Sequence, residues 1–174
     1  MESRFYALVV GVLTAIAVTG LPASAADGPA SEEWRRCTGE GAAATDLVIK
    51  SCTVVVQSSR ESKANLAIAH YHRATANRIE GRTDRAIQDY DQAIQLDPTY
   101  AIAYNDRGTA YSQKAQPNRG IQNFDQAIRL DPTLASAFNN RGNAYSVRGE
   151  LERAIQDYDQ AIRLEPKYAF ALNN

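Results

Sequence analysis

The ten residues RAIQDYDQAI occur twice in this chain, letter for letter, at 85–94 and at 153–162. A close variant, RGIQNFDQAI, occupies 119–128, so that the three copies begin 34 residues apart. The same interval separates three prolines that each follow an acidic residue: Pro98, Pro132 and Pro166. A constant period of this kind predicts a repeat protein, in which one structural unit recurs along the chain.

Each repeat carries the pattern of two amphipathic helices. In the second helix of the first unit, polar residues face one side and an apolar stripe at helical spacing the other; the stripe consists of Ala86, Ile87, Tyr90, Ala93 and Ile94. The Asp-Pro pair then ends this helix, because the residue before a proline is disfavoured in the α conformation. We therefore predict helix pairs at 67–100, 101–134 and 135–168.

The turn inside each pair is predicted from its glycine. Gly81 and Gly149 follow the first helices of the first and third units, where a left-handed cap is favoured. The middle unit has Ala115 and then Pro117 instead. Since proline suits the first turn of the next helix, we expect a slightly altered turn there and an intact unit.

This unit resembles the tetratricopeptide repeat, a 34-residue helix–turn–helix with the pattern Trp-x2-Leu-Gly-x2-Tyr, Ala-x3-Phe, Pro. The middle unit matches it at Tyr104, Arg107, Gly108, Tyr111, Gly120, Phe124 and Pro132. The third unit matches it at Phe138, Arg141, Gly142, Tyr145, Ala154, Tyr158 and Pro166. The first unit is the weakest match. Arginine replaces the leucine in all three units, and its charged end can reach towards an aspartate of the second helix.

The resemblance implies an all-α, right-handed solenoid of stacked antiparallel helix pairs. One pair cannot bury its apolar stripe alone, so each unit must pack against the next, which explains why the same residues recur. The resemblance also implies a non-catalytic scaffold that binds a protein or an extended peptide on its concave face.

The first 25 residues have the pattern of a secretory signal peptide. A short polar start with one arginine precedes an apolar run at 5–21, and the small residues Ala23-Ser24-Ala25 follow. This pattern predicts export with cleavage after Ala25 or Ala26. An uncleaved membrane anchor is the alternative, but the run falls short of the ~20 residues that a span prefers. We expect a periplasmic or secreted protein whose mature chain has no membrane contact.

Both cysteines, Cys37 and Cys52, lie in the mature chain. An even number in an oxidising compartment favours a disulfide, which would stabilise the fold by roughly 3 kcal/mol. A redox pair lacks its usual CxxC spacing here, and two ligands alone do not make a zinc site. We interpret 26–66 as a degenerate, disulfide-pinned N-terminal unit with its junction, in which Thr45 or Asp46 is a helix N-cap.

The inner side of the first helices carries mostly amides and hydroxyls. An asparagine can donate to a peptide carbonyl and accept from a peptide N–H, so that a row of them could hold an extended backbone. The alternative is an ordinary solvated helix face. Arg78 is the single cation on this side, which argues against the binding of a terminal carboxylate by clustered cations. The candidate peptide-binding residues are Tyr71, Arg78, Asn105, Asp106, Thr109, Asn139, Asn140 and Asn143.

Several other functions are disfavoured by the sequence. A net charge of −1 and the lack of a basic run disfavour nucleic-acid binding. His70 and His72 are two positions apart and point to different sides of a helix, so they are not expected to bind a metal together. The aspartates recur in every unit, which indicates a structural role instead of a single active site. We therefore expect no enzyme activity, no metal and no cofactor.

Residues 169–174 begin a fourth repeat. Two alternatives to peptide binding follow from this. The protein could be a structural protein that self-assembles as a homo-oligomer through an uncapped C-terminal end. The chain could also be a fragment of a longer protein whose catalytic part is missing.

Overall fold

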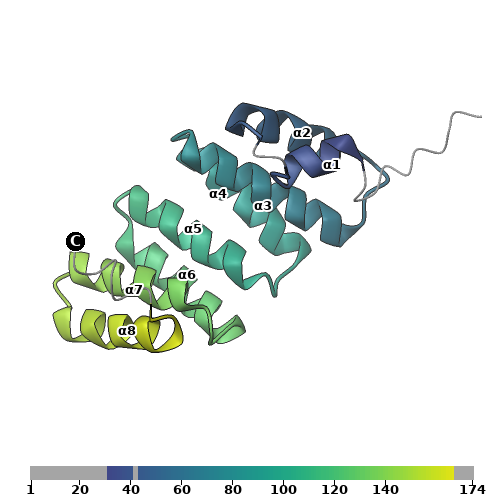
Figure 1. Cartoon of the computed structure of the whole chain (residues 1–174). Helices are drawn as coiled ribbons and strands as arrows, with labels where there is room; N and C mark the ends of the chain where they lie inside the picture. The colour runs from purple at the N-terminus through teal and green to yellow at the C-terminus, as the bar shows by residue number, and fades with distance from the viewer. Residues whose placement is uncertain (1–30, 41–42, 167–174) are drawn as a thin grey trace, which may run out of the picture.

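The computed structural model describes residues 31–40 and 43–166, and all regular secondary structure within them is α-helical (Figure 1). The all-α prediction is therefore confirmed. The predicted signal peptide, 1–25, and the start of a fourth repeat, 169–174, lie outside the described residues. The helices are α1 (Glu32–Cys37), α2 (Thr45–Gln57), α3 (Lys63–Ile79), α4 (Thr83–Leu96), α5 (Ala101–Gln113), α6 (Pro117–Leu130), α7 (Ala135–Val147) and α8 (Leu151–Leu164).

The helices stack in chain order as antiparallel pairs. Helices α3 and α4, α5 and α6, and α7 and α8 form the three repeats, and α4 packs on α5 as α6 packs on α7. Figure 1 shows the pairs following one another from α1 to α8. The first helices also contact each other directly, α3 with α5 and α5 with α7. Because the described second helices α4, α6 and α8 make no such contact with one another, the first helices line the inner curve of the stack, where the candidate site lies.

Small residues allow the two helices of a pair to approach closely. A Cβ atom on Gly108 would lie 2.6 Å from Cε1 of Phe124, and one on Gly142 would lie 2.7 Å from Cε1 of Tyr158. Real Cβ atoms do not approach this closely, so the aromatic ring of the second helix occupies the place of the missing side chain. Glycine inside a helix costs about 1 kcal/mol relative to alanine, and this packing offsets the cost.

The turn of the middle repeat is not altered, contrary to expectation. Ala115 adopts the left-handed conformation, with φ of 55°, as Gly81 and Gly149 do. The hydrogen bonds of the turn are also the same: N–H of Gln116 donates to the carbonyl of Tyr111 as N–H of Glu150 donates to that of Tyr145. The capping bonds thus hold Ala115 in the left-handed conformation, which is energetically unfavourable for residues that have a Cβ atom.

A disulfide closes the N-terminal unit. Cys37 at the end of α1 and Cys52 in α2 are bonded, with 4.6 Å between their Cα atoms, and both are fully buried. Their neighbours in this part of the core include Trp34 and Ala69 of α3. The expected N-cap of α2 is wrong: the helix begins at Thr45, and its cap is Ala44, whose side chain makes no capping bond.

Helix α3 begins before the repeat pattern does. Its first residue is Lys63, four positions ahead of Ala67, and the hydroxyl of Ser62 accepts a hydrogen bond from N–H of Asn65. The N-terminal half of α3 packs against α1 and α2, since Ile68 and Ala69 contact their apolar core. The N-terminal unit therefore covers the first repeat.

The outer side of α8 is exposed. The isoleucine of the repeated decapeptide is 8% exposed in the first copy, at Ile87, and 7% in the second, at Ile121, but 58% in the third, at Ile155. The next helix pair covers the first two copies, whereas α8 is the last helix that the structure describes. Leu151 is also exposed on this helix.

Candidate functional site

Arginines of the first helices hold successive repeats together. Arg141 binds both carboxylate oxygens of Asp157 in its own repeat, at 2.8 and 2.7 Å, and Asp125 of the preceding repeat at 2.6 Å. Arg107 follows the same arrangement, with Asn123 at 2.8 Å and Asp91 at 2.5 Å. The arginine at the leucine position thus joins the second helices of two neighbouring repeats.

The first repeat has the same contact with one addition. Arg73 binds Asp89 through two hydrogen bonds, at 2.9 and 2.7 Å, and reaches Thr53 of α2. His70 lies 2.9 Å from the same carboxylate. Burial alone would raise the pKa of Asp89, but hydrogen bonds from His70 and Arg73 outweigh it and lower the pKa below its ordinary value. This aspartate is therefore a structural anion, and the arginine contacts fix the relative positions of the first helices.

A chain of hydrogen bonds crosses the inner face from repeat to repeat. The hydroxyl of Tyr71 on α3 donates to Asp106 on α5 at 2.9 Å. The amide of Asn105 donates to the other oxygen of Asp106 at 3.0 Å. Asn140 on α7 then donates to the Asn105 oxygen at 3.0 Å and lies 3.4 Å from the Thr109 hydroxyl. Five of the candidate residues thus form one network across three helices.

Asn105 is the most buried of the candidate residues. Its side chain is buried, with the residue 4% exposed, and both ends of its amide are bonded within the protein. Asn105 therefore connects α5 with α7, and little of its surface is exposed.

The remaining candidates differ in how far they reach the surface. Asn143 is exposed and accepts a hydrogen bond from the Tyr158 hydroxyl at 2.8 Å. Asn139 and Asn140 are half-buried, and Asn139 joins none of the bonds of the network. The buried Nε of Arg78 has no hydrogen-bond partner among the described residues. Asn143 is therefore the most accessible of the candidate residues, and Asn140 is half-buried beside it on α7.

Asp106 is a half-buried carboxylate in this network. Burial raises its pKa above the ordinary value of 3.8, although hydrogen bonds from Tyr71 and Asn105 and the charge of Arg78 act in the opposite direction. Burial and the same carboxylate raise the pKa of the Tyr71 hydroxyl. The folded protein therefore binds the Asp106 proton more tightly than the unfolded chain does.

Asp106→Asn is expected to stabilise the protein at neutral pH. Because the folded-state pKa is raised, native stability falls as pH rises from about 3.8 through that pKa. The third repeat has an asparagine, Asn140, at the same position. Because an asparagine does not ionise, the variant should not lose stability in this way as the pH rises. Urea unfolding at several pH values should show the variant to be more stable at pH 7 and the difference to shrink towards pH 3. Asp159→Asn, at an exposed position, is the control; a lower stability of the Asp106 variant at pH 7 would contradict the prediction.

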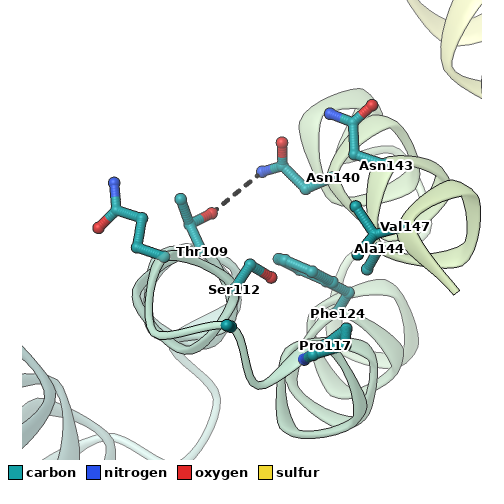
Figure 2. Close-up of a pocket in the computed structure, with 10 residues that line it drawn as sticks. Thr109, Ser112, Pro117, Phe124, Asn140, Asn143, Ala144 and Val147 are labelled. Atoms are coloured by element: carbon teal, nitrogen blue, oxygen red, sulfur yellow. Dashed lines mark hydrogen bonds between the residues drawn. The ribbon is translucent and has the colours of Figure 1, made fainter.

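A pocket of about 310 Å³ opens beside Asn140 and Asn143. Figure 2 shows Thr109 and Ser112 of α5 on one side, Ala144 and Val147 of α7 on the other, and the Phe124 ring of α6 between them. Sequence reasoning missed this pocket. Its signal was the pair Ser112 and Phe124, which stand where the first repeat has Arg78 and Tyr90.

Family comparisons agree with the geometry. Models described as tetratricopeptide repeat match residues 101–134 and 135–168, and one described as TPR repeat matches 76–114. The chain is also 32% identical to the second TPR of Spaghetti (RPAP3), solved with the HSP90 peptide SRMEEVD, and covers 92% of that chain and 57% of its own length, with a TM-score of 0.56. The chain belongs to the tetratricopeptide repeat family.

Two other solved structures share the fold. The MamA protein is 26% identical, with a TM-score of 0.62; the match covers 72% of this chain and spans 66% of MamA. The Arabidopsis OM64 TPR domain is 22% identical, with a TM-score of 0.60 over 61% of this chain and 88% of the domain. A comparison with curated proteins found no match.

Two further features of the described residues bear on the site. No group of three or more His, Cys, Asp or Glu side chains in 31–40 and 43–166 is arranged to hold a metal ion. Within the same residues, none of the helices has the length and apolar character needed to cross a bilayer.

Proposed function

We propose that this tetratricopeptide protein is a scaffold that binds an extended peptide along the inner face of α3, α5 and α7. The observation that carries the proposal is the network of polar side chains that crosses this face and ends at the half-buried Asn140. Its Nδ2 is used within the protein, which leaves the side-chain oxygen to accept from a peptide N–H. The related TPR of Spaghetti, solved with an HSP90 peptide, supports a peptide as the partner.

The recognition of a charged terminus has less support here. Arg78 is the cation among the candidate residues, and its charge already acts on the nearby Asp106 carboxylate, whose pKa it lowers against the effect of burial. A partly neutralised cation attracts a carboxylate weakly. We therefore propose that the groove holds the middle of a peptide through its backbone.

Asn140→Ala tests this function. The probe is an array of acetylated, amidated decapeptides, followed by fluorescence polarisation of the strongest binders. Loss of one backbone hydrogen bond should weaken binding by about 2- to 10-fold. Gln122→Ala, which removes an exposed amide from α6, is the matched control and should leave affinity unchanged. If both variants bind the peptides as tightly as the native chain does, Asn140 does not contribute to peptide binding.

We also propose that the chain is exported. The signal-peptide pattern supports this, as does the Cys37–Cys52 disulfide, because structural disulfides persist in oxidising compartments. Mass spectrometry of the protein recovered from outside the cytoplasm should show a chain that begins at Ala26 or Asp27. An intact N-terminus would argue against cleavage.

A further inference from the structure

The pocket between α5, α6 and α7 is open because two side chains are smaller than their counterparts in the first repeat. There, the longer Arg78 and the hydroxyl-bearing Tyr90 stand at the corresponding positions, and the Thr75 hydroxyl lies 3.1 Å from that of Tyr90. In the second repeat, Ser112 and Phe124 stand at these positions. A phenyl ring without its hydroxyl and a serine in place of arginine leave the space empty.

The pocket is lined by apolar groups and carries no charge. Its ten lining residues include neither acid nor base. The Phe124 ring lies at the floor of the pocket, where the residue is only 1% exposed, and Ala144, Pro117 and Val147 lie around it (Figure 2). Val147 is 79% exposed, which leaves a large apolar side chain almost uncovered at the edge. A charged group placed here would lose water without gaining a partner, whereas an apolar group would gain burial.

The polar residues of the pocket lie where a peptide backbone would pass. Asn140 and Asn143 of α7 and Thr109 of α5 lie on either side of the same space, and Asn140 belongs to the network of the inner face. A backbone held by Asn140 would therefore place one side chain over Phe124. This arrangement combines a few directional polar groups with an apolar pocket, as ligand sites in proteins commonly do.

We infer that this pocket binds an uncharged aliphatic side chain, of the size of leucine or methionine, from the extended peptide that occupies the groove. The inference rests on the proposed peptide binding and specifies which side chain of the peptide the site prefers. The second and third repeats together bind this side chain. The first repeat has the larger Arg78 and Tyr90 at the corresponding positions and is expected to bind no side chain there.

The test uses a peptide array and a variant taken from the chain itself. Acetylated and amidated decapeptides of Gly, Ser and Asn carry one central residue: Leu, Met, Ala, Gln, Asp or Lys. The double variant Ser112→Arg/Phe124→Tyr installs the residues of the first repeat and fills the pocket. A second variant, Val147→Gln, changes only an exposed position, to the residue type that the second repeat has there, and so cannot fail through misfolding of the core.

The native chain should bind Leu and Met peptides about tenfold more tightly than Gln, Asp or Lys peptides, as expected for burial of one aliphatic side chain. The filled variant should lose this preference, and Val147→Gln should reduce it. Helical circular dichroism confirms that both variants are folded.

Other results would separate the two proposals. Binding that ignores the central residue, or a preference that survives in both variants, would overturn the pocket inference and leave peptide binding in place. A complete lack of binding to any peptide would overturn the proposed function, and the inference with it. Acetyl-leucine amide binding as tightly as the whole Leu peptide would also contradict the inference, because the backbone would then contribute nothing.

Discussion

Arg141→Met should lower the free energy of unfolding by about 3 to 5 kcal/mol, which is the usual cost of removing one partner from a buried ion pair. The substitution leaves the carboxylate of Asp157 without its two hydrogen bonds at a position where its side chain is only 8% exposed. The Asp125 side chain is 37% exposed and can be rehydrated, so its lost bond adds less. Methionine keeps much of the apolar stem, which confines the change to the charge.

The second repeat supplies the matched control. Arg107 has the same place and burial as Arg141, but its partner in its own repeat is the neutral Asn123, and its charged partner, Asp91, is 47% exposed. Arg107→Met leaves no buried charge without a partner, so it should lower the free energy of unfolding by only about 1 kcal/mol. Urea unfolding followed by circular dichroism measures both values.

A rescue separates the charge from simple packing loss. In Arg141→Met/Asp157→Asn the buried anion becomes the amide that the second repeat has at this position, so part of the lost stability should return. Equal losses for the two single arginine variants, or no rescue by the second substitution, would show that these arginines act through their stems alone.

The sequence predicts those features of the fold that depend on period. The 34-residue interval predicts the helix pairs and their stacking, because every repeat must bury the same stripe on the next one. The charged ends of Arg73 and Arg141 were expected to reach an aspartate of the second helix, and they do. Both results depend on the residue type and its place in the repeat, which the sequence contains.

The site is less predictable because it depends on the orientation of individual side chains and on the space left where a side chain is smaller than its counterpart in another repeat. Helical spacing assigns Asn105 to the inner side but not its rotation towards α7, which buries it. The pocket exists because Ser112 and Phe124, twelve residues apart, are both smaller than their counterparts, and their shared space becomes apparent only when three helices are placed together.

The exposed side of α8 shows a similar limit. The repeated decapeptide is identical in α4 and α8, yet Ile87 is covered and Ile155 is not, because exposure depends on the neighbour and not on the unit. Self-assembly through this end stays a prediction.

Reduction of the Cys37–Cys52 disulfide should cost about 3 kcal/mol, the value that the chain-entropy model gives for a loop of about 15 residues. Two features make this bond important to the N-terminal unit. Helix α1 has six residues, far below the length at which an isolated helix is stable in water. Both cysteines are fully buried and take part in the core that covers α3.

The loss should be confined to one end of the stack, because each repeat of a solenoid contacts only its neighbours. Hydrogen exchange after reduction should become faster in α1 and α2 and in the N-terminal half of α3, and should stay unchanged in α7 and α8. Cys37→Ala/Cys52→Ala should behave like the reduced protein, and the reductant should have no further effect on this variant. Unchanged exchange in α1 after reduction would mean that Trp34 and its apolar neighbours hold the unit without the bond. Uniformly faster exchange up to α8 would mean that the repeats unfold as one cooperative unit, so that the disulfide stabilises the groove between α5 and α7 as well.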